Sequence, residues 1–432
     1  MVISSIDLKD GHVVQLKNGK DLMLQRDDAD KLISDFNTYG EVAVIDLDAA
    51  LRNTDAKGNT PNTELLKSLL RKGNVRVGGG IRDVKKAKEL ISLGAEKVII
   101  GSAAWKKAPS AGESPLDTEF LSQLEKAIGR QRIIISVDAI HGKIAVRGWT
   151  ETIDVPLIDG AREAEKYASE LLFTCVEKEG CMEGTDMDMV RQLRDAVHCR
   201  VVAAGGVNSL EQVAELEKCG CDVQLGMALY TGAVHLEDCF SACLDWEKTG
   251  GMIPVIAQSP AGEVLMHGYA NKEALAKTME TKKLTFWSRT RNTLWTKGET
   301  SGHFLAVQKL RADCDRDTIL ATVEPHGGVC HTGSFTCFGS DPDERSSMER
   351  LYATIADRFA SPRPGSYTAT LNDKRVREKV MEEAEELTEA EGRQDVIWEA
   401  ADVLYFISVL MYKEGVTWQD IYDELDRRHK EH

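Results

Sequence analysis

Three aspartates, three cysteines and His331, all of types that can bind metal or move protons, fall between residues 313 and 337. Asp313, Asp315 and Asp317 alternate with other residues, so in an extended or turning segment their carboxylates point the same way. Hard oxygen ligands of this kind suit Mg²⁺, and the spacing therefore predicts a magnesium site. A solvated acidic turn is the alternative interpretation of the aspartates.

The thiols of the same stretch offer a second metal chemistry. Cys314, Cys330 and Cys337 supply the soft ligands that Zn²⁺ prefers, and three ligands leave a fourth position for a reactive water. His331 is placed to move the proton of that water. A lone cysteine is more often a small buried hydrophobe, but seven such residues within 25 positions favour metal binding.

The sequence around these residues resembles the phosphoribosyl-AMP cyclohydrolases, which open the adenine ring in histidine biosynthesis. The runs GEVLMHGYANKEAL (262–275), TFWSRTRNTLWTKGETSGH (285–303), DCDRD and CHTG…CF follow the order and spacing of that family. The resemblance implies an α+β domain over residues 251–340, with zinc on the three cysteines, Mg²⁺ on the three aspartates and a zinc site shared across a homodimer. It also implies substrate contacts from Ser288, Arg289, Arg291, Lys297, Glu299 and Ser301.

Short apolar runs separated by helical patterns fill residues 1–245. They lie at residues 2–8, 42–47, 75–78, 97–102, 132–139, 171–177, 200–205 and 223–229. Strands that alternate with helices indicate right-handed βαβ units and a parallel sheet, and eight of them predict a (β/α)₈ TIM barrel. A doubly wound open sheet is the alternative.

An internal repeat favours the barrel and suggests its substrate. The aspartate and glycine of DLKDG match those of DAIHG, and the Gly79-Gly80 turn followed by Gly101 matches Gly205-Gly206 followed by Gly226. Each Gly-Gly turn follows a strand and precedes a helix, where free backbone N–H groups can hold a phosphate. Two such turns predict a substrate with a phosphate at each end, although one turn alone would be an ordinary tight loop.

Each half of the repeat begins with a strand that ends in an aspartate. Asp7 and Asp138 would face one another at the C-terminal mouth of a barrel, where they could act as acid and base. A loop-capping aspartate is the structural alternative.

The barrel sequence resembles the phosphoribosyl-formimino-AICAR-phosphate isomerases. The resemblance rests on SIDLKDG, VIDLDAA, RVGGGIRD, IGSAA, SVDA…VRGW, FT and AGGV…LGMALY. It implies an Amadori rearrangement of a bisphosphorylated substrate by Asp7 and Asp138 with support from Thr174, and it adds Arg82, Ser102 and Trp149 to the binding residues.

Three positions depart from that family. Gln15 replaces the usual arginine, Glu179-Gly180 replaces an aspartate-glycine pair, and Ala49 replaces a glycine. These changes weaken the expected grip on the substrate while they leave the acid and base in place. A catalytically silent barrel that serves as a scaffold therefore remains an alternative.

Residues 346–432 have the pattern of four helices, with Gly392 and Gly415 at expected C-caps and Thr417 with Asp420 as an N-terminal capping pair. Spacings of three and four place carboxylates on one face of each of two helices, beside an apolar stripe that must be buried. Such carboxylates need a counter-ion, which Mg²⁺ would supply. They are Glu382, Glu383, Glu386, Glu399 and Asp402.

An acidic solvated helix face would explain the glutamate run alone. EExxE followed by ExxD, together with SYTATL, KVMEEAEEL and WEAADVLYF, resembles phosphoribosyl-ATP pyrophosphatase. A house-cleaning nucleotide pyrophosphatase acting on unrelated triphosphates is the alternative function of this all-α domain.

Composition sets the remaining limits. The chain has 432 residues and a net charge of −16, which argues against a nucleic-acid surface and favours small phosphorylated nucleotides as partners. Its ten cysteines without a secretory leader predict a cytoplasmic protein, and no apolar run is long enough to predict a membrane span. The three resemblances together predict consecutive steps of histidine biosynthesis: pyrophosphate release, ring opening, then isomerisation.

Overall fold

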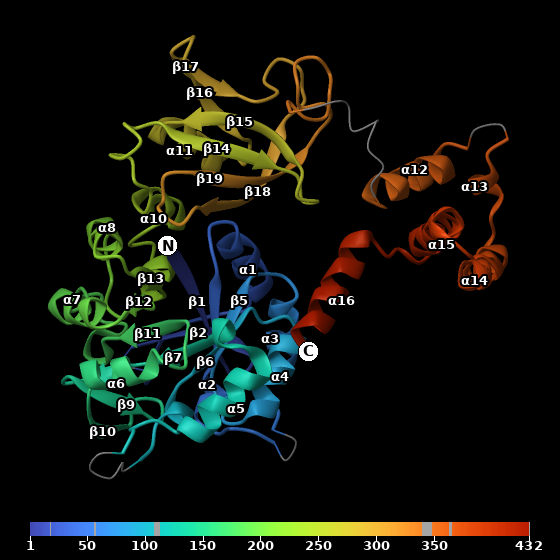
Figure 1. Cartoon of the computed structure of the whole chain (residues 1–432). Coiled ribbons are helices and arrows are strands. Elements are labelled where there is room, and N and C mark those ends of the chain that lie inside the picture. The colour runs from blue at the N-terminus through green and yellow to red at the C-terminus, as the bar shows by residue number, and fades with distance from the viewer. Residues whose placement is uncertain (18, 56–57, 108–112, 339–347, 363–364, 432) are drawn as a thin grey trace. The chain divides into compact units, whose positions relative to one another are not determined.

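The computed structural model describes residues 1–17, 19–55, 58–107, 113–338, 348–362 and 365–431. The chain divides into two compact units, Met1–Gly327 and Gly328–His429. The first unit contains a barrel followed by a β-rich portion, and the second is mainly helical (Figure 1). Within the described ranges, no helix is both long enough and apolar enough to cross a membrane.

A closed parallel barrel forms the N-terminal part, as the sequence predicts. Its described strands are β1 (Val2–Lys9), β4 (Val42–Asp46), β5 (Val75–Gly78), β6 (Lys97–Ile100), β7 (Ile133–Ser136), β11 (Glu170–Thr174), β12 (Arg200–Ala204) and β13 (Asp222–Leu225). Each pairs in parallel with its neighbour, and β13 returns to β1 with Val223 opposite Val2. This closure excludes the alternative of an open doubly wound sheet.

Helices follow the strands and surround the barrel. The longer ones are α1 (Ala29–Asn37), α3 (Thr63–Leu70), α4 (Val84–Ser92), α5 (Thr118–Ile128), α6 (Leu157–Ala164), α7 (Met187–Ala196), α8 (Leu210–Lys218) and α10 (Leu236–Ala242), with short helices α2 (Leu47–Ala50) and α9 (Met227–Tyr230). Several begin at a side chain that accepts a backbone N–H, as Asp83 does for α4 and Ser209 for α8.

An antiparallel extension of the barrel sheet and one small separate sheet follow two of the barrel strands. Strands β2 (His12–Lys17) and β3 (Asp21–Arg26) continue antiparallel from β1, and β8 (Ala139–Ile140), β9 (Lys143–Val146) and β10 (Glu151–Pro156) form a separate sheet after β7. Asp7 lies in β1 and Asp138 lies just after β7, so both additions are close in sequence to the predicted acid and base and can shape the cavity around them.

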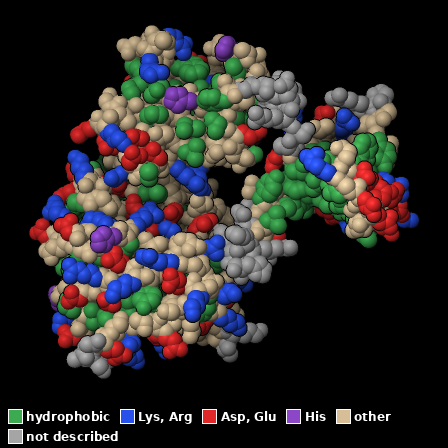
Figure 2. Space-filling view, viewed as in Figure 1, with side chains coloured by type: hydrophobic (Ala, Val, Ile, Leu, Met, Phe, Trp, Pro, Cys, Tyr) green, Lys and Arg blue, Asp and Glu red, His purple; other side chains and the backbone are tan. Residues whose placement is uncertain are grey.

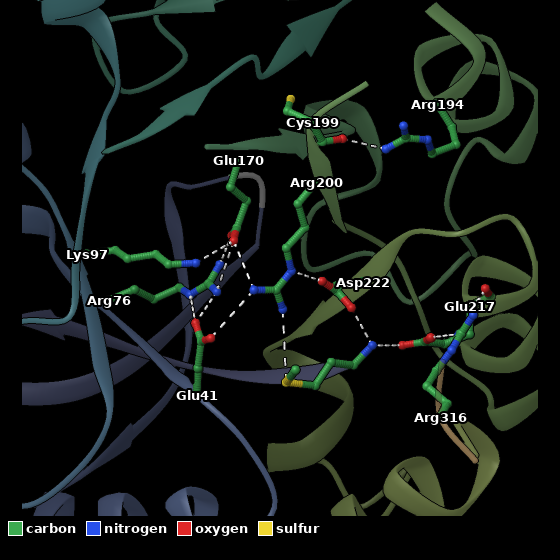
Figure 3. Close-up of polar contacts among 11 residues, drawn as sticks. Glu41, Arg76, Lys97, Glu170, Arg194, Cys199, Arg200, Glu217, Asp222 and Arg316 are labelled. Carbon is green, nitrogen blue, oxygen red and sulfur yellow. Dashed lines mark hydrogen bonds and ion pairs between the residues drawn. The ribbon is translucent and has the colours of Figure 1, made fainter. Parts of the chain in front are cut away.

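The interior of the barrel has an apolar layer and an ionic layer. The apolar layer contains Ile3, Ala43, Ile99, Ile134, Leu172, Val202 and Ala204. Beyond it, at the N-terminal ends of the strands, Arg76 pairs with Glu41 and Glu170, and Glu170 also accepts from Lys97 at 3.0 Å and Arg200 at 3.2 Å (Figure 3). Arg76 and Glu170 are fully buried, so each depends on the other's charge.

The β-rich portion consists of a four-stranded sheet, a hairpin and a helix. The sheet contains β14 (Ile253–Gln258), β15 (Val264–Ala270), β18 (Leu305–Ala312) and β19 (Ile319–Pro325), in the order β15-β14-β19-β18. The hairpin pairs β16 (Thr285–Ser288) with β17 (Thr293–Thr296), and α11 (Lys272–Thr281) packs beside it. The predicted α+β class is confirmed.

The described residues of the helical unit form the four predicted helices and one more. They are α12 (Met348–Ala360), α13 (Tyr367–Thr370), α14 (Asp373–Glu389), α15 (Arg393–Glu414) and α16 (Trp418–Glu431). Ile355, Leu371, Val376, Phe406 and Val409 form its core. The surface of this unit carries hydrophobic side chains next to a group of acidic ones (Figure 2).

The predicted caps of the helical unit are partly correct. Gly415 ends α15 in a left-handed conformation, and Thr417 and Asp420 exchange hydrogen bonds at the start of α16. The prediction for Gly392 was wrong: α14 already ends at Glu389, and Gly392, at φ +84°, is the N-cap of α15. The extended backbone of Ala390 ends the earlier helix, so the glycine instead turns the chain into the next one.

Candidate active sites

A cavity of about 270 Å³ opens among the C-terminal ends of the barrel strands. Both predicted catalytic aspartates line it, as does Thr174 at the end of β11. The predicted binding residues line the same cavity: Gly79, Gly80, Arg82, Gly101, Ser102, Trp149, Gly205, Gly206 and Gly226. The structure thus brings together residues from both halves of the repeat.

Backbone geometry explains the Gly-Gly turns. Gly79 has φ +102°, and a Cβ atom there would stand 2.2 Å from the carbonyl oxygen of Asp46. Gly205 has φ +91°, and its Cβ atom would stand 2.8 Å from the carbonyl oxygen of Cys175. Both positions exclude side chains, which keeps the backbone N–H groups of the turns accessible to an anion.

Burial raises the pKa of Asp7 to about 6, and a 3.0 Å hydrogen bond from the Ser5 hydroxyl opposes the shift. Burial also raises the pKa of Asp138, against hydrogen bonds from Trp149, Ser136 and Thr174. The indole Nε1 of Trp149 donates to Asp138 Oδ2 at 2.7 Å. The two aspartates therefore occupy different environments, as an acid and base pair requires.

A third carboxylate lines the cavity, and the sequence interpretation gave it no catalytic role. Burial raises the pKa of Glu179 to about 8, and the charges of Asp7 and Asp138 add to the shift. Its Oε2 would lie 3.2 Å from a Cβ atom at Gly205, which places the carboxyl beside a predicted phosphate turn. Glu179 is therefore protonated at neutral pH and can donate a proton. A carboxylate directly before a glycine after β11 was the available signal.

Of the other two departures, Gln15 lines this cavity and Ala49 lies against Gly80, which lines it. Gln15 is buried, and its Nε2 has no hydrogen-bond partner among the described residues. Because Gln15 lines the cavity, this donor is available to a ligand. Ala49 fills the space beside Gly80, and its carbonyl oxygen accepts from Arg82 Nη2 at 3.0 Å.

In the β-rich portion, the predicted carboxylate cluster forms. Ligand oxygens of Asp313, Asp315 and Asp317 lie within 4.8 Å of one another. The ammonium group of Lys248 lies against two of them, with its Nζ 2.6 Å from Asp317 and in contact with Asp315. An oxygen-only donor set that already attracts a cation fits Mg²⁺.

The cysteines predicted to bind zinc are all free thiols. Cys314 is exposed and belongs to the first unit, whereas Cys330 and Cys337 belong to the second. Hydrogen bonds from Thr332 and then Cys337 lower the pKa of the Cys330 thiol, which favours the thiolate that zinc needs. His331 Nδ1 lies 3.7 Å from Cys330 Sγ.

The six predicted substrate contacts of this portion lie in or just after the β16–β17 hairpin. They are Ser288, Arg289, Arg291, Lys297, Glu299 and Ser301. The Arg289 guanidinium stacks 3.8 Å from the ring centre of Tyr269, and Lys297 is buried and donates to the His303 carbonyl at 3.2 Å. Their placement in and just after one hairpin suits contact with a shared ligand.

In the helical unit, ligand oxygens of Glu383, Glu386 and Glu399 lie within 4.8 Å of one another. Partial burial raises the pKa of Glu399, and the charges of Glu386, Asp402 and Glu383 add to this. Glu399 Oε2 is buried and unpartnered within the described part of the chain. An orphaned carboxylate oxygen in an acidic group fits a divalent cation.

The remaining two predicted carboxylates differ from these. Glu382 lies outside the group of three and pairs with Lys379 at 2.8 Å and Arg375 at 3.7 Å, although Lys379 also lies 2.6 Å from Glu383. Asp402 lies outside the group of three and acts on it through its charge. The prediction of metal ligation at these two positions stays a prediction.

The barrel, the carboxylate clusters and the thiols fit a multidomain enzyme that acts on phosphorylated nucleotides. Residues 1–235 match the family model of the histidine biosynthesis proteins, 266–339 that of phosphoribosyl-AMP cyclohydrolase, and 348–429 that of phosphoribosyl-ATP pyrophosphohydrolase. The chain belongs to the histidine biosynthesis protein family, and both hydrolase domains follow the barrel in the sequence.

Curated proteins that are similar to part of this chain also belong to histidine biosynthesis. The histidine biosynthesis bifunctional protein HisIE of Vibrio cholerae is 42% identical over 197 residues, which cover 43% of this chain and 94% of the relative. The HisIE proteins of Escherichia coli and Pasteurella multocida are 43% and 44% identical, with 96% and 98% of their lengths covered and 43% of this chain in each case. The chain is therefore an enzyme of histidine biosynthesis with cyclohydrolase and pyrophosphohydrolase domains.

Proposed function

We propose that this chain performs three consecutive reactions: hydrolysis of phosphoribosyl-ATP to phosphoribosyl-AMP and pyrophosphate, hydrolytic opening of the adenine ring, and Amadori isomerisation of the product. The observation that carries the third reaction is the barrel cavity, which joins two Gly-Gly turns with three carboxylates of perturbed pKa. A cavity of that composition suits a sugar with a phosphate at each end.

In the isomerisation, one carboxyl protonates the ribose ring oxygen while another removes the proton from C2. Asp7, with a pKa of about 6, is largely ionised at neutral pH and is suited to be the base. Asp138, the other aspartate of the predicted pair, would then be the acid, and Glu179, with a pKa of about 8, is a second proton donor in the same cavity. Thr174 and Trp149 are placed to hold Asp138, through hydrogen bonds to its carboxyl.

In the ring-opening reaction, we propose that Cys314, Cys330 and Cys337 hold zinc. Bound zinc would supply an acidified water for attack on the adenine ring. His331, next to the thiolate of Cys330, accepts and returns the proton. The site would be shared across a homodimer, as the family resemblance implies, and size-exclusion chromatography with light scattering together with zinc analysis tests this.

For pyrophosphate release, we propose that Glu383, Glu386 and Glu399 hold Mg²⁺ with support from Glu382 and Asp402. Bound Mg²⁺ would neutralise the polyphosphate charge and activate water. The three central glutamates converge from α14 and α15, so the site exists only when those helices pack together. The cytoplasmic location and the lack of a nucleic-acid partner stay predictions.

One experiment tests the reaction sequence: the full chain receives phosphoribosyl-ATP with Mg²⁺ and Zn²⁺, and the final product is identified by mass and by chromatography against authentic standards. We expect the isomerised aminoketose. The Asp7→Asn and Asp138→Asn variants should instead accumulate the ring-opened aminoaldose, with isomerisation at least ~10²-fold slower. A wild-type chain that stops at the aminoaldose would refute barrel activity and favour the scaffold alternative.

A further inference from the structure

An ion pair joins the barrel to the loop of residues 313–317, which holds the three aspartates of the cyclohydrolase portion. Arg316 lies inside that loop, and its Nη1 donates to the Glu217 carbonyl at 3.0 Å and contacts Glu217 Oε2 (Figure 3). Glu217 belongs to α8 of the barrel and is almost fully buried. The positive guanidinium thus meets both a buried carboxylate and a carbonyl in the last turn of a helix, where its charge is favoured.

The backbone at Arg316 is unusual for its residue type. Arg316 has φ +63°, in the left-handed region that non-glycine residues rarely adopt. Its carbonyl oxygen accepts from the Asp245 backbone N–H at 2.8 Å, so both its side chain and its main chain are held from outside the loop. A strained conformation persists when surrounding contacts determine it, and these contacts do so here.

This conformation shapes the carboxylate cluster directly. Asp315 and Asp317 flank Arg316, and Asp313 Oδ1 accepts the N–H groups of Asp317 at 3.0 Å and Thr318 at 3.1 Å. A change of φ at Arg316 would rotate one flanking aspartate away from the other. The convergence of the three carboxylates therefore depends on the anchor at Arg316.

We propose that Glu217 of the barrel is a positioning residue for the cyclohydrolase: through Arg316 it holds the loop of residues 313–317 so that the three carboxylates converge on one divalent cation. This inference rests on the proposed Mg²⁺ site in that loop. It gives the barrel a role in ring opening that is separate from any isomerisation. Arg316 transmits this role from Glu217 to the aspartate loop.

The test measures Mn²⁺ binding to the full chain by electron paramagnetic resonance, with Mn²⁺ as the probe in place of Mg²⁺. All variants carry Glu383→Gln, which weakens the cation site of the helical unit. Arg316→Gln and Glu217→Gln should each raise the Mn²⁺ dissociation constant of the loop at least fivefold, and the double variant should be no worse than either single one. Excess Mg²⁺ should restore ring opening in each.

Glu215→Gln is the matched control, because Glu215 lies on the same helix but pairs with the exposed Arg191. Its Mn²⁺ affinity should equal that of the parent. Glu217 also contacts the Met1 amino group, so Arg316→Gln isolates the proposed contact if Glu217→Gln folds poorly. Unchanged Mn²⁺ affinity in a folded Arg316→Gln variant would overturn the inference.

The Asp315→Asn variant distinguishes a failure of the positioning contact from a failure of the proposed metal site. If Asp315→Asn weakens Mn²⁺ binding while Arg316→Gln does not, the loop binds the cation and the barrel does not position it. If Asp315→Asn has no effect either, the proposed metal site itself is wrong, and the inference fails with it.

Discussion

Replacing Glu179 with glutamine should stabilise the protein at alkaline pH while it slows isomerisation. The Glu179 carboxyl has a pKa of about 8 in the folded chain because of burial and the charges of Asp7 and Asp138, against an ordinary value of 4.5. Between these two pH values the folded chain keeps a proton that the unfolded chain has lost. The free energy of unfolding must therefore fall as the pH rises through that window.

The pKa shift of Glu179 sets the size of the change in the free energy of unfolding. Each pKa unit is worth about 1.4 kcal/mol, so keeping Glu179 in the cavity costs at most about 5 kcal/mol at pH 8 and above. The cost vanishes near pH 4, where the carboxyl is protonated in both states. Glutamine has a similar shape and no charge, so Glu179→Gln should recover most of this free energy only in the alkaline range.

The assay compares the denaturant unfolding of wild type and Glu179→Gln at pH 5 and pH 8. The fluorescence of Trp149, which lines the cavity, reports the unfolding of the barrel. Glu183→Gln, an exposed glutamate that pairs with Lys178, is the matched control and should show no pH-dependent gain. Equal gains at both pH values, or none, would refute the assignment of a buried protonated carboxyl.

The pH profile of isomerisation tests the same assignment through the rate. An ionised Asp7 and a protonated Glu179 predict a bell-shaped kcat/KM, with limbs near pH 6 and pH 8. Glu179→Gln should lower the rate by about 10²-fold and remove the alkaline limb. An unchanged alkaline limb in this variant would assign the acid to Asp138 instead.

Further predictions concern the other sites. Glu383→Gln should abolish pyrophosphate release while ring opening of supplied phosphoribosyl-AMP persists, which a pyrophosphate assay and a chromatographic assay measure side by side; loss of both in a folded variant would contradict separate sites. Cys330→Ser should lower bound zinc and stop ring opening, as metal analysis would show, and full zinc retention would exclude this ligand. Lys248→Met should lower the Mg²⁺ concentration needed for half-maximal ring opening several-fold, since a competing cation is removed. Arg76→Met should destabilise the barrel by about 3–5 kcal/mol in a denaturant titration, because buried Glu170 loses a partner, and a near-neutral result would show that Lys97 and Arg200 suffice.

The parts of the structure that follow from local patterns were predictable. Apolar β-branched runs and the repeated Gly-Gly turns indicated the barrel, and spacings of three and four placed Glu383 and Glu386 on one face of a helix. The capping pair before α16 was equally local. Each of these features depends on a few neighbouring residues, so one sequence carries enough information.

Features that depend on distant segments were not predictable in the same way. The raised pKa of Glu179 comes first from its burial in the folded barrel and then from the charges of Asp7 and Asp138, which belong to distant parts of the chain. Lys248 and Glu217 reach the aspartate loop from segments about 70 and 100 positions earlier in the chain. No spacing rule relates such positions, because only the closed fold brings them together.

The ionic layer closes the barrel at the N-terminal ends of its strands. Arg76 and Glu170 are 1% and 0% exposed, and with their partners they occupy the end opposite the cavity, below the apolar layer. A phosphorylated sugar cannot pass through charges that are already paired and packed. Among the residues that the structure describes, the open end of the barrel is therefore the C-terminal one, and substrate and product of the proposed isomerisation would enter and leave at that same end.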